Sequence, residues 1–257
     1  MLKKLLFSLF LFVLFLLSWA LFGLGVEHFR GVPFPMPQSV FYRFYEFLSG
    51  ELLYEHHILE HFFASLKRWL FAYVLAALFG FCLGLISGWF EKTHKLGVMS
   101  ATLLQMMPGL AWIPFAMLLF GIGEKATLFM IFMTAFPPIF LHVSTAVANL
   151  PKEYVKMGQM MGLSRGVFLG KILFPYLLPS LVVGLRIGLA IGWRVLIAAE
   201  MVVGGSQGLG YTIIQSRWSL DFESAFISIG LICLVGLFFE KFVFTKVEEY
   251  IHKRLRI

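Results

Sequence analysis

Long apolar runs separated by shorter polar segments dominate the chain. Each run approaches the roughly 20 apolar residues that an α-helix needs to cross a bilayer. The clearest five are residues 5–26, 69–90, 96–120, 126–147 and 225–244. A sixth run, at about residues 176–201, is as long but carries three charged side chains. The pattern predicts an all-α integral membrane protein with about six transmembrane helices, built as one domain over residues 1–257.

The first run, residues 5–26, also occupies the position of a signal peptide. It follows Lys3 and Lys4, but it is longer than the roughly 7–15 apolar residues of a signal-peptide core. No small-x-small cleavage site follows it. We therefore expect a retained first membrane span.

Residues 27–65 differ in kind from the runs around them. They contain three prolines, five glutamates and four histidines. This composition predicts a water-exposed, extracytoplasmic segment with an amphipathic helix near its end. Within it, His57, Glu60 and His61 match the H-x-x-E-H spacing of one class of zinc peptidases. Because so short a motif often arises by chance and no third ligand is evident, we expect an exposed helix here and no metal site.

Residues 152–175 form a second polar segment, punctuated by glycine. Pro151 can begin a short helix, and Gly162 suits the left-handed residue that ends one. Ser164 can cap a second helix, and Pro175 is expected to end it. The pattern therefore predicts a structured loop of two short helices.

Composition supports the membrane assignment. Hydrophobic residues make up 60% of the 257 and charged residues only 14%, whereas soluble domains are about 45–50% apolar and about 25% charged. The net charge of +7 then reflects loop cations that set orientation, and a nucleic-acid partner is not expected. Cys82 and Cys233 lie inside apolar runs, where we expect buried, inert thiols and no disulfide.

The distribution of lysine and arginine predicts the orientation. With the amino terminus inside, thirteen of these 21 residues fall on inner segments and four on outer segments. Positive charge accumulates on the cytoplasmic side of membrane proteins. Both termini and residues 152–175 are therefore expected in the cytoplasm.

The spacing of Gly162, Ile172 and Pro175 resembles the cytoplasmic signature of binding-protein-dependent ABC importer permeases. That signature reads E-A-A, three residues, G, nine residues, then I-x-L-P. Its first three positions fall on Lys156, Met157 and Gly158. The acidic residue is therefore absent at its usual place, and Glu153 lies one turn earlier.

Other motifs resemble the branch of this family that imports taurine, alkanesulfonates, nitrate or bicarbonate. They are Gln105-Met-Met-Pro108 through Gly123, Gly184-Leu-Arg186, Trp193 through Met201, and Gly208-Leu-Gly210. The similarity covers about residue 65 to the carboxyl end and is specific for the family more than for the cargo.

The resemblance implies a multi-pass permease of the bacterial inner membrane, with a coupling helix between spans four and five. Its implied partners are a second permease copy, a cytoplasmic ABC ATPase dimer, a periplasmic solute-binding protein and membrane lipid. The chain has no Walker A sequence, so ATP and Mg²⁺ belong to the ATPase and this subunit is not itself an enzyme. The implied ATPase-coupling residues are Glu153, Lys156, Met157, Gly158, Gly162, Ser164, Arg165, Ile172 and Pro175.

The charged residues of the sixth run are candidates for the translocation path. Arg186 and Arg194 are eight residues apart and so lie on nearly the same helix face. An arginine within a span is costly and usually faces a bundle interior or a water-filled path. They either form an electropositive lining for an anion, or Arg186 reaches the cytoplasmic surface while Arg194 pairs with an acid or a carbonyl. Glu200 is poorly placed on the helix to be the partner of Arg194.

Pro108 and Pro114 interrupt the run at residues 96–120. A proline there frees backbone carbonyls and favours a kinked helix. Such a helix could line or gate a path, with Gln105 and Trp112 as contacts, or the kink could serve packing alone. The glycine-rich stretch at residues 204–210 lacks the Lys-Ser/Thr of a phosphate loop and is expected to be a flexible outer turn.

Together these features predict the permease subunit of an ABC importer that moves a small solute by alternating access. The arginines and the branch favour an anion such as a sulfonate, nitrate or bicarbonate. The same branch includes importers of heterocyclic vitamin precursors, which stay open as cargo. The competing classes are a membrane metallopeptidase and an ion-gradient-driven transporter.

Overall fold

The computed structural model describes residues 2–255, and these fold as helices joined by short turns. The α-helices are α1 (Leu2–Arg30), α2 (Pro37–Leu48), α3 (Ile58–Trp89), α4 (Glu91–Met106), α5 (Ile113–Phe120), α6 (Glu124–Ala148), α7 (Lys152–Met160), α8 (Arg165–Phe168), α9 (Phe174–Val202), α10 (Leu209–Ser219), α11 (Phe222–Phe238) and α12 (Thr245–Leu255). A 3-10 turn, η1 (Gly109–Trp112), and two π-helical turns, η2 (Leu169–Leu173) and η3 (Phe239–Phe244), join some of them.

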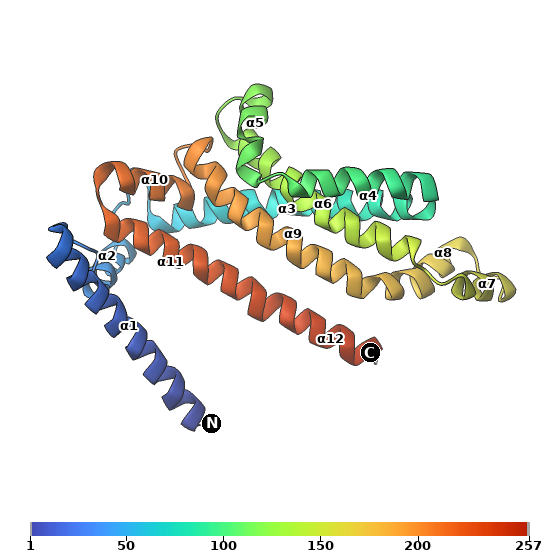
Figure 1. Ribbon diagram of the computed structural model, residues 1–257, viewed down its shortest axis with the longest axis horizontal. Helices are drawn as coiled ribbons and strands as arrows, with labels where there is room; N and C mark the ends of the chain where they lie inside the picture. Colours follow the sequence, from blue (N-terminus) through green and yellow to red (C-terminus); the bar gives the residue numbers. More distant parts are fainter. Residues whose placement is uncertain (1, 256–257) are drawn as a thin grey trace.

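The long helices lie side by side and separate two ends of the molecule (Figure 1). Helices α2 and α10 lie at one end, and α7 and α8 project from the other. Helix α1 leans away from the bundle and meets it beside α2, while α5 projects from the opposite side. This arrangement gives the molecule two ends at which loops and short helices gather.

Helix α6 lies at the centre and packs against α3, α4 and α9. Glycines spaced by four residues on α3 allow the close approach, because a Cβ on Gly80 or Gly84 would lie 3.0 or 2.9 Å from Ile139 or Val143. On α9, a Cβ on Gly188 would lie 2.8 Å from the carbonyl oxygen of Ala135. Small residues at helix contacts are typical of membrane bundles, where backbone approach replaces a hydrophobic driving force.

The predicted number of spans is confirmed with one qualification. Five helical segments are long and apolar enough to cross a membrane, and a sixth candidate is the pair α4 and α5, bent by 100°. The break follows Met107, whose ψ of 124° is extended as expected before a proline. Pro108 thus breaks the run at residues 96–120. Pro114 lies in the first turn of α5, where a proline is tolerated.

The segment at residues 27–65 is less open to water than predicted. Helix α1 continues to Arg30, and the residues expected to form a separate amphipathic helix are the first turns of α3. Phe47, Leu53 and Ile58 are buried in a small cluster with Ile227 of α11. A stretch of polar composition therefore contributes a core at this end, since its few large apolar side chains converge.

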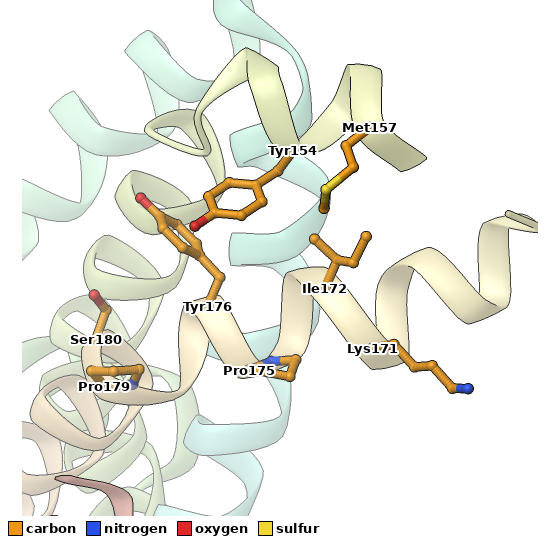
Figure 2. Close-up of a pocket in the computed structure, with 8 residues that line it drawn as sticks. All are labelled: Tyr154, Met157, Lys171, Ile172, Pro175, Tyr176, Pro179 and Ser180. Carbon is orange, nitrogen blue, oxygen red and sulfur yellow. The ribbon is translucent and has the colours of Figure 1, made fainter. Parts of the chain in front are cut away.

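Pro175 does not end the helix that follows Gly162, contrary to the prediction. The chain is helical from Arg165 to Val202, and Pro175 lies in the first turn of α9 (Figure 2). A proline inside a helix loses one hydrogen bond and its ring crowds the carbonyl four residues earlier, here that of Lys171. That carbonyl belongs to the π-helical turn η2, which is wider than an α-helical turn and makes room for the ring.

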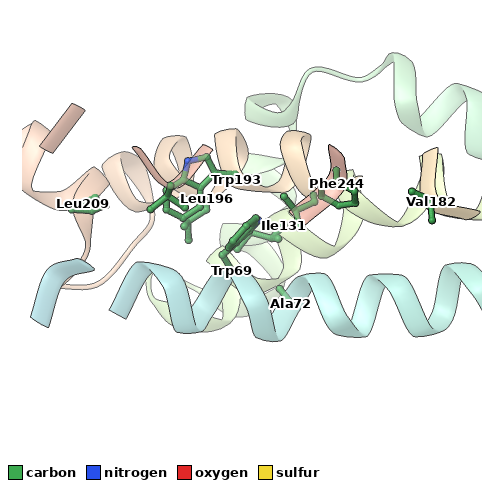
Figure 3. Packing of buried hydrophobic residues seen from close by; sticks show 10 residues of the cluster. Trp69, Ala72, Ile131, Val182, Trp193, Leu196, Leu209 and Phe244 are labelled. Carbon is green, nitrogen blue, oxygen red and sulfur yellow. The ribbon is translucent and has the colours of Figure 1, made fainter. Parts of the chain in front are cut away.

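The central core joins α3 and α9 to the last span, residues 222–249, which consists of α11, η3 and the start of α12 (Figure 3). The ring of Trp69 lies 4.9 Å from Trp193 and 4.8 Å from Phe239, centroid to centroid, in edge-to-face geometry. Cys82 and Cys233 are free thiols with exposed side chains on the outside of the bundle. The expectation of buried thiols was therefore wrong, because these apolar runs present one face outward.

Candidate functional site

Helix α7 ends in a fixed turn at Gly162. The Leu163 amide donates to the Gly158 carbonyl and the Gly162 amide to the Gln159 carbonyl, both at 3.0 Å. These two bonds and the Gly162 φ of +61° define a Schellman ending, in which a residue with a Cβ is strained. The prediction of a left-handed stop at Gly162 is confirmed.

The second short helix begins at Ser164, as predicted, but without the expected side-chain cap. Ser164 has extended backbone at the helix start, and its carbonyl accepts from the Phe168 amide at 2.9 Å. Its hydroxyl makes no capping hydrogen bond. The chain direction here is therefore held by backbone bonds.

Gly158 brings the two short helices into contact. It is buried, and a Cβ there would lie 2.7 Å from the Phe168 ring. Phe168 in turn packs edge-on against Trp89 at the end of α3, with ring centroids 6.4 Å apart. The elbow formed by residues 152–168 is thus braced against the membrane bundle at one aromatic contact.

The outer surface of this elbow is exposed and partly apolar. Met160 is 88% exposed, Met161 is 65% exposed and Met157 is 43% exposed. Glu153, Lys156, Ser164 and Arg165 are also exposed. The predicted coupling residues are therefore exposed, apart from the buried Gly158 and the half-buried Ile172 and Pro175.

A pocket of about 660 Å³ lies between α7 and the start of α9. Figure 2 shows Met157 and Ile172 pointing toward each other across it, with Tyr154 beside Tyr176. The two tyrosine rings are 6.2 Å apart, and the Tyr176 hydroxyl donates to the Asn149 carbonyl at 3.0 Å. Ile172 and Pro175 thus line the junction between the elbow and α9.

Arg186 is occupied by two carboxylates of the last span. Its guanidinium pairs with Glu240 of η3 and, at 2.8 Å, with Glu248 of α12. Sequence reasoning did not find these acids as partners, because they lie 54 and 62 residues away. The arginine therefore ties the carboxyl-terminal helix to α9.

Arg194 shares a groove with Arg186 between α9 and the last span. The groove has a volume of about 550 Å³ and is also lined by Trp193, Glu240 and Phe244. Arg194 is exposed, and its Nε donates to the Ala190 carbonyl at 3.1 Å. This bond fits the alternative in which Arg194 pairs with a carbonyl, and both arginines lie on the same helix face, as predicted. The place of Arg194 in a translocation path stays a prediction.

Glu200 lies in the interior and is 2% exposed. Its carboxylate accepts hydrogen bonds from Arg68 at 2.7 Å, from the Ser65 hydroxyl at 2.8 and 2.9 Å, and from the Gly210 amide at 3.0 Å. Arg68 also donates to the Gln207 carbonyl at 2.8 Å. The glutamate fixes the loop at residues 203–208 to α3, and its predicted place in a translocation path stays a prediction.

His61 is buried, which corrects the expectation of an exposed helix. The Gly208 amide donates to its Nδ1 at 3.1 Å, so Nε2 carries the proton and donates to the Leu53 carbonyl at 3.0 Å. Both ring nitrogens are therefore used by the backbone, while His57 is exposed. The described residues contain no group of three or more His, Cys, Asp or Glu side chains that could hold a metal ion.

The bent segment carries the remaining path candidates. Gln105 and Pro108 are exposed at the break between α4 and η1. Trp112 is buried against Val195 and Ala199 of α9 and lies 5.9 Å from the Phe129 ring of α6. Trp112 is therefore a core residue in this structure. Gln105 and Pro108 do not line the groove that holds the two arginines.

Comparison with known proteins shows a consistent set of similarities. Residues 80–257 match a family model described as the binding-protein-dependent transport system inner membrane component. A nitrate import permease of Leptolyngbya laminosa is 32% identical over 68% of this chain and 62% of its own. A bicarbonate transport system permease of Synechococcus elongatus is 29% identical over 70% of this chain and 65% of its own. The match thus spans less than two thirds of either relative.

The fold also resembles solved structures. An inward-facing form of the MetNI methionine ABC transporter, in its native crystal form, contains a chain that superposes with a TM-score of 0.56. The identity is 21%, over 76% of this chain and 97% of that one. At this identity the likeness concerns the fold.

Proposed function

Because the chain belongs to the family of binding-protein-dependent transport system inner membrane components, we propose that it is the membrane-spanning permease subunit of an ABC importer. Its elbow, residues 152–168, is the surface on which a cytoplasmic ATPase docks. A second permease copy and an extracytoplasmic solute-binding protein complete the assembly. The catalytic step, ATP hydrolysis, belongs to the partner subunit.

The observation that carries this proposal is the elbow itself. It combines a fixed Schellman turn, a brace through Gly158 and Phe168, and exposed methionines at its tip. A rigid short helix transmits a push, and methionine side chains adapt to a partner pocket. The second helix of the elbow, α8, continues through η2 into α9 without a break. Motion of the elbow therefore moves a membrane span.

The arrangement of helices supports cytoplasmic placement of the elbow. Helix α11 runs from the α10 end toward the α7 end, and α1 runs from its amino terminus toward the α2 end (Figure 1). The carboxyl end and the elbow therefore point to the same side, and α1 begins away from the α2 end. The lysine and arginine distribution supports the cytoplasm as that side.

We propose a small anion as cargo. The nitrate and bicarbonate relatives and the exposed Arg194 in a groove support this choice. Arg186 supports it less, because Glu240 and Glu248 already neutralise its charge. Arg194 is thus the better candidate for an anion contact.

Site-directed crosslinking tests the docking surface. Met160→Cys, in a background carrying Cys82→Ala and Cys233→Ala, should crosslink to a subunit identified as an ABC ATPase when native membranes are labelled with a maleimide–benzophenone reagent and irradiated. ATP hydrolysis by the purified complex should then fall. A matched cysteine at Ser219, at the other end of the bundle, should give no such crosslink. Crosslinking of the ATPase to Ser219→Cys and not to Met160→Cys would overturn the proposal.

A further inference from the structure

Helix α2 lies outside the part of the chain that matches the family model, which begins at residue 80. It follows α1 after six residues, 31–36. Helix α1 is an apolar span of which only 6% is buried. The short connection fixes the depth of α2, because it must begin close to the level at which α1 leaves the membrane.

The side chains of α2 fall into three sectors at 100° per residue. One sector is buried and holds Val40 and Phe47, which pack with Ile227 of α11. A second sector is exposed and aromatic or aliphatic, with Gln38 as its one polar member. Its other members are Phe41 at 55%, Tyr42 at 68%, Tyr45 at 67% and Leu48 at 55% exposed. The helix therefore has apolar surface on two sides.

The third sector is polar and internally neutralised. Arg43 donates to Glu46 at 2.9 Å and to Glu51 at 2.6 Å, and its guanidinium lies 4.7 Å from the Phe47 ring centroid. Ser39 shares this sector and is half-buried. The charges of α2 are thus gathered on one side and leave the aromatic sector free of charge.

The orientation of α2 is fixed by contacts at both of its ends. At the beginning, the Trp19 indole donates to the Pro35 carbonyl at 3.0 Å and stacks 5.4 Å from Phe226. After the helix, the Tyr54 hydroxyl donates to Ser216 of α10 at 2.8 Å. The aromatic sector cannot rotate inward, because the buried sector is already packed.

We propose that α2 lies in the membrane–water interface on the extracytoplasmic side of the membrane that α1 spans. Phe41, Tyr45 and Leu48 insert at the acyl boundary, and Tyr42 lies at headgroup level. The partner is the lipid surface itself. Phe29, near the end of α1, and Val32, just after it, are also exposed, at 85% and 51%. Interfacial helices place an apolar face about 5–10 Å into the headgroup boundary, and tyrosine is enriched at this level.

This inference does not depend on the transport proposal, since it requires only that α1 spans the bilayer. A soluble partner such as the solute-binding protein would instead meet the aromatic sector in water. Lipid accounts better for an uncharged aromatic sector on a helix that is joined to a membrane span by only six residues. The two occupants give different results in the same experiment.

Fluorescence quenching tests the placement. Single cysteines Tyr45→Cys and Leu48→Cys, in the Cys82→Ala, Cys233→Ala background, are labelled with bimane in proteoliposomes. We expect lipid spin-labelled near the ester linkage to quench both labels severalfold more than it quenches a label at the control Ser39→Cys. Aqueous iodide should quench them less than the control.

Two results would overturn the proposal. One is quenching of both labels by iodide as strongly as free bimane, without quenching by spin-labelled lipid. The other is iodide quenching that disappears only when solute-binding protein is added, which would make the sector a protein contact. Use of two cysteine positions guards against loss of one variant through misfolding.

Discussion

At the scale of single residues, Arg68 and Glu200 form an ion pair that is almost completely buried. The Glu200 side chain is fully buried and that of Arg68 is 10% exposed. Removing one partner of a buried pair costs about 3–5 kcal/mol, because the other charge is left uncompensated. We therefore predict that Arg68→Ala strongly lowers the midpoint of thermal unfolding in detergent.

The neighbouring cation supplies the control for this prediction. Lys67 is exposed, so Lys67→Ala should stay within about 0.5 kcal/mol of the parent. The double variant Arg68→Gln, Glu200→Gln should recover part of the loss, since neither buried charge remains. Equal midpoints for Arg68→Ala and Lys67→Ala would contradict the assigned role.

Gly158 gives a second residue-scale prediction, on coupling. A Cβ there would lie 2.7 Å from Phe168, so Gly158→Ala should shift α7 against α8 and Gly158→Leu should displace it. The stimulation of ATP hydrolysis by solute should fall in Gly158→Ala and fall further in Gly158→Leu. Gly166→Ala is the matched control because a Cβ there meets nothing within 4 Å. Solute-stimulated hydrolysis unchanged in Gly158→Leu would contradict the brace.

Residue-scale prediction from sequence succeeded where the reason was local. Gly162 was identifiable because only glycine readily adopts the left-handed turn that ends a helix. The partner of Glu200 was not, because Arg68 lies 132 residues away and nothing local indicates it. The same holds for Arg186 and its two acids.

At the scale of elements, the groove between α9 and the last span separates two roles for arginine. Arg186 is paired and its side chain is 36% exposed, so Arg186→Gln should cost about 0.2–1 kcal/mol and loosen α12. Among the described residues, Arg194 bonds only a carbonyl of its own helix, so Arg194→Gln should leave stability near that of the parent. It should instead lower uptake of the anion.

Uptake into proteoliposomes and thermal unfolding, measured on both variants, check this separation. Arg194→Lys keeps the charge and should retain part of the uptake, which a purely structural role would not predict. Normal anion uptake by Arg194→Gln would remove Arg194 from the path.

Element boundaries were predictable where apolar runs end in polar residues, and less so at prolines. Pro108 breaks its run, while Pro175 is absorbed into a continuous helix. The difference lies in the preceding turn. Met107 takes extended backbone, whereas residues 169–173 form a π-helical turn that accommodates the ring. Proline alone does not specify which of these its neighbours will adopt.

At the scale of the whole molecule, the number of spans and the all-helical fold follow from hydropathy and length. The centre of the bundle does not. Helix α6 is central because glycines of α3 and α9 face it. In the sequence alone, these glycines look like the small residues found in many membrane helices. Which faces meet depends on three helices at once, so it could not be read from any one of them.

The two ends of the bundle give the last prediction, which concerns sidedness. Met161, 65% exposed, lies at the α7 end, and Ser219, also exposed, lies at the α10 end. Single cysteines at these positions, in the Cys82→Ala, Cys233→Ala background, should react from opposite sides of the membrane. In intact cells with a permeable outer membrane, a membrane-impermeant maleimide should label Ser219→Cys alone. After lysis it should label both. Labelling of Met161→Cys in intact cells would place the elbow outside, where no ATPase can reach it, and would contradict both the orientation and the docking surface.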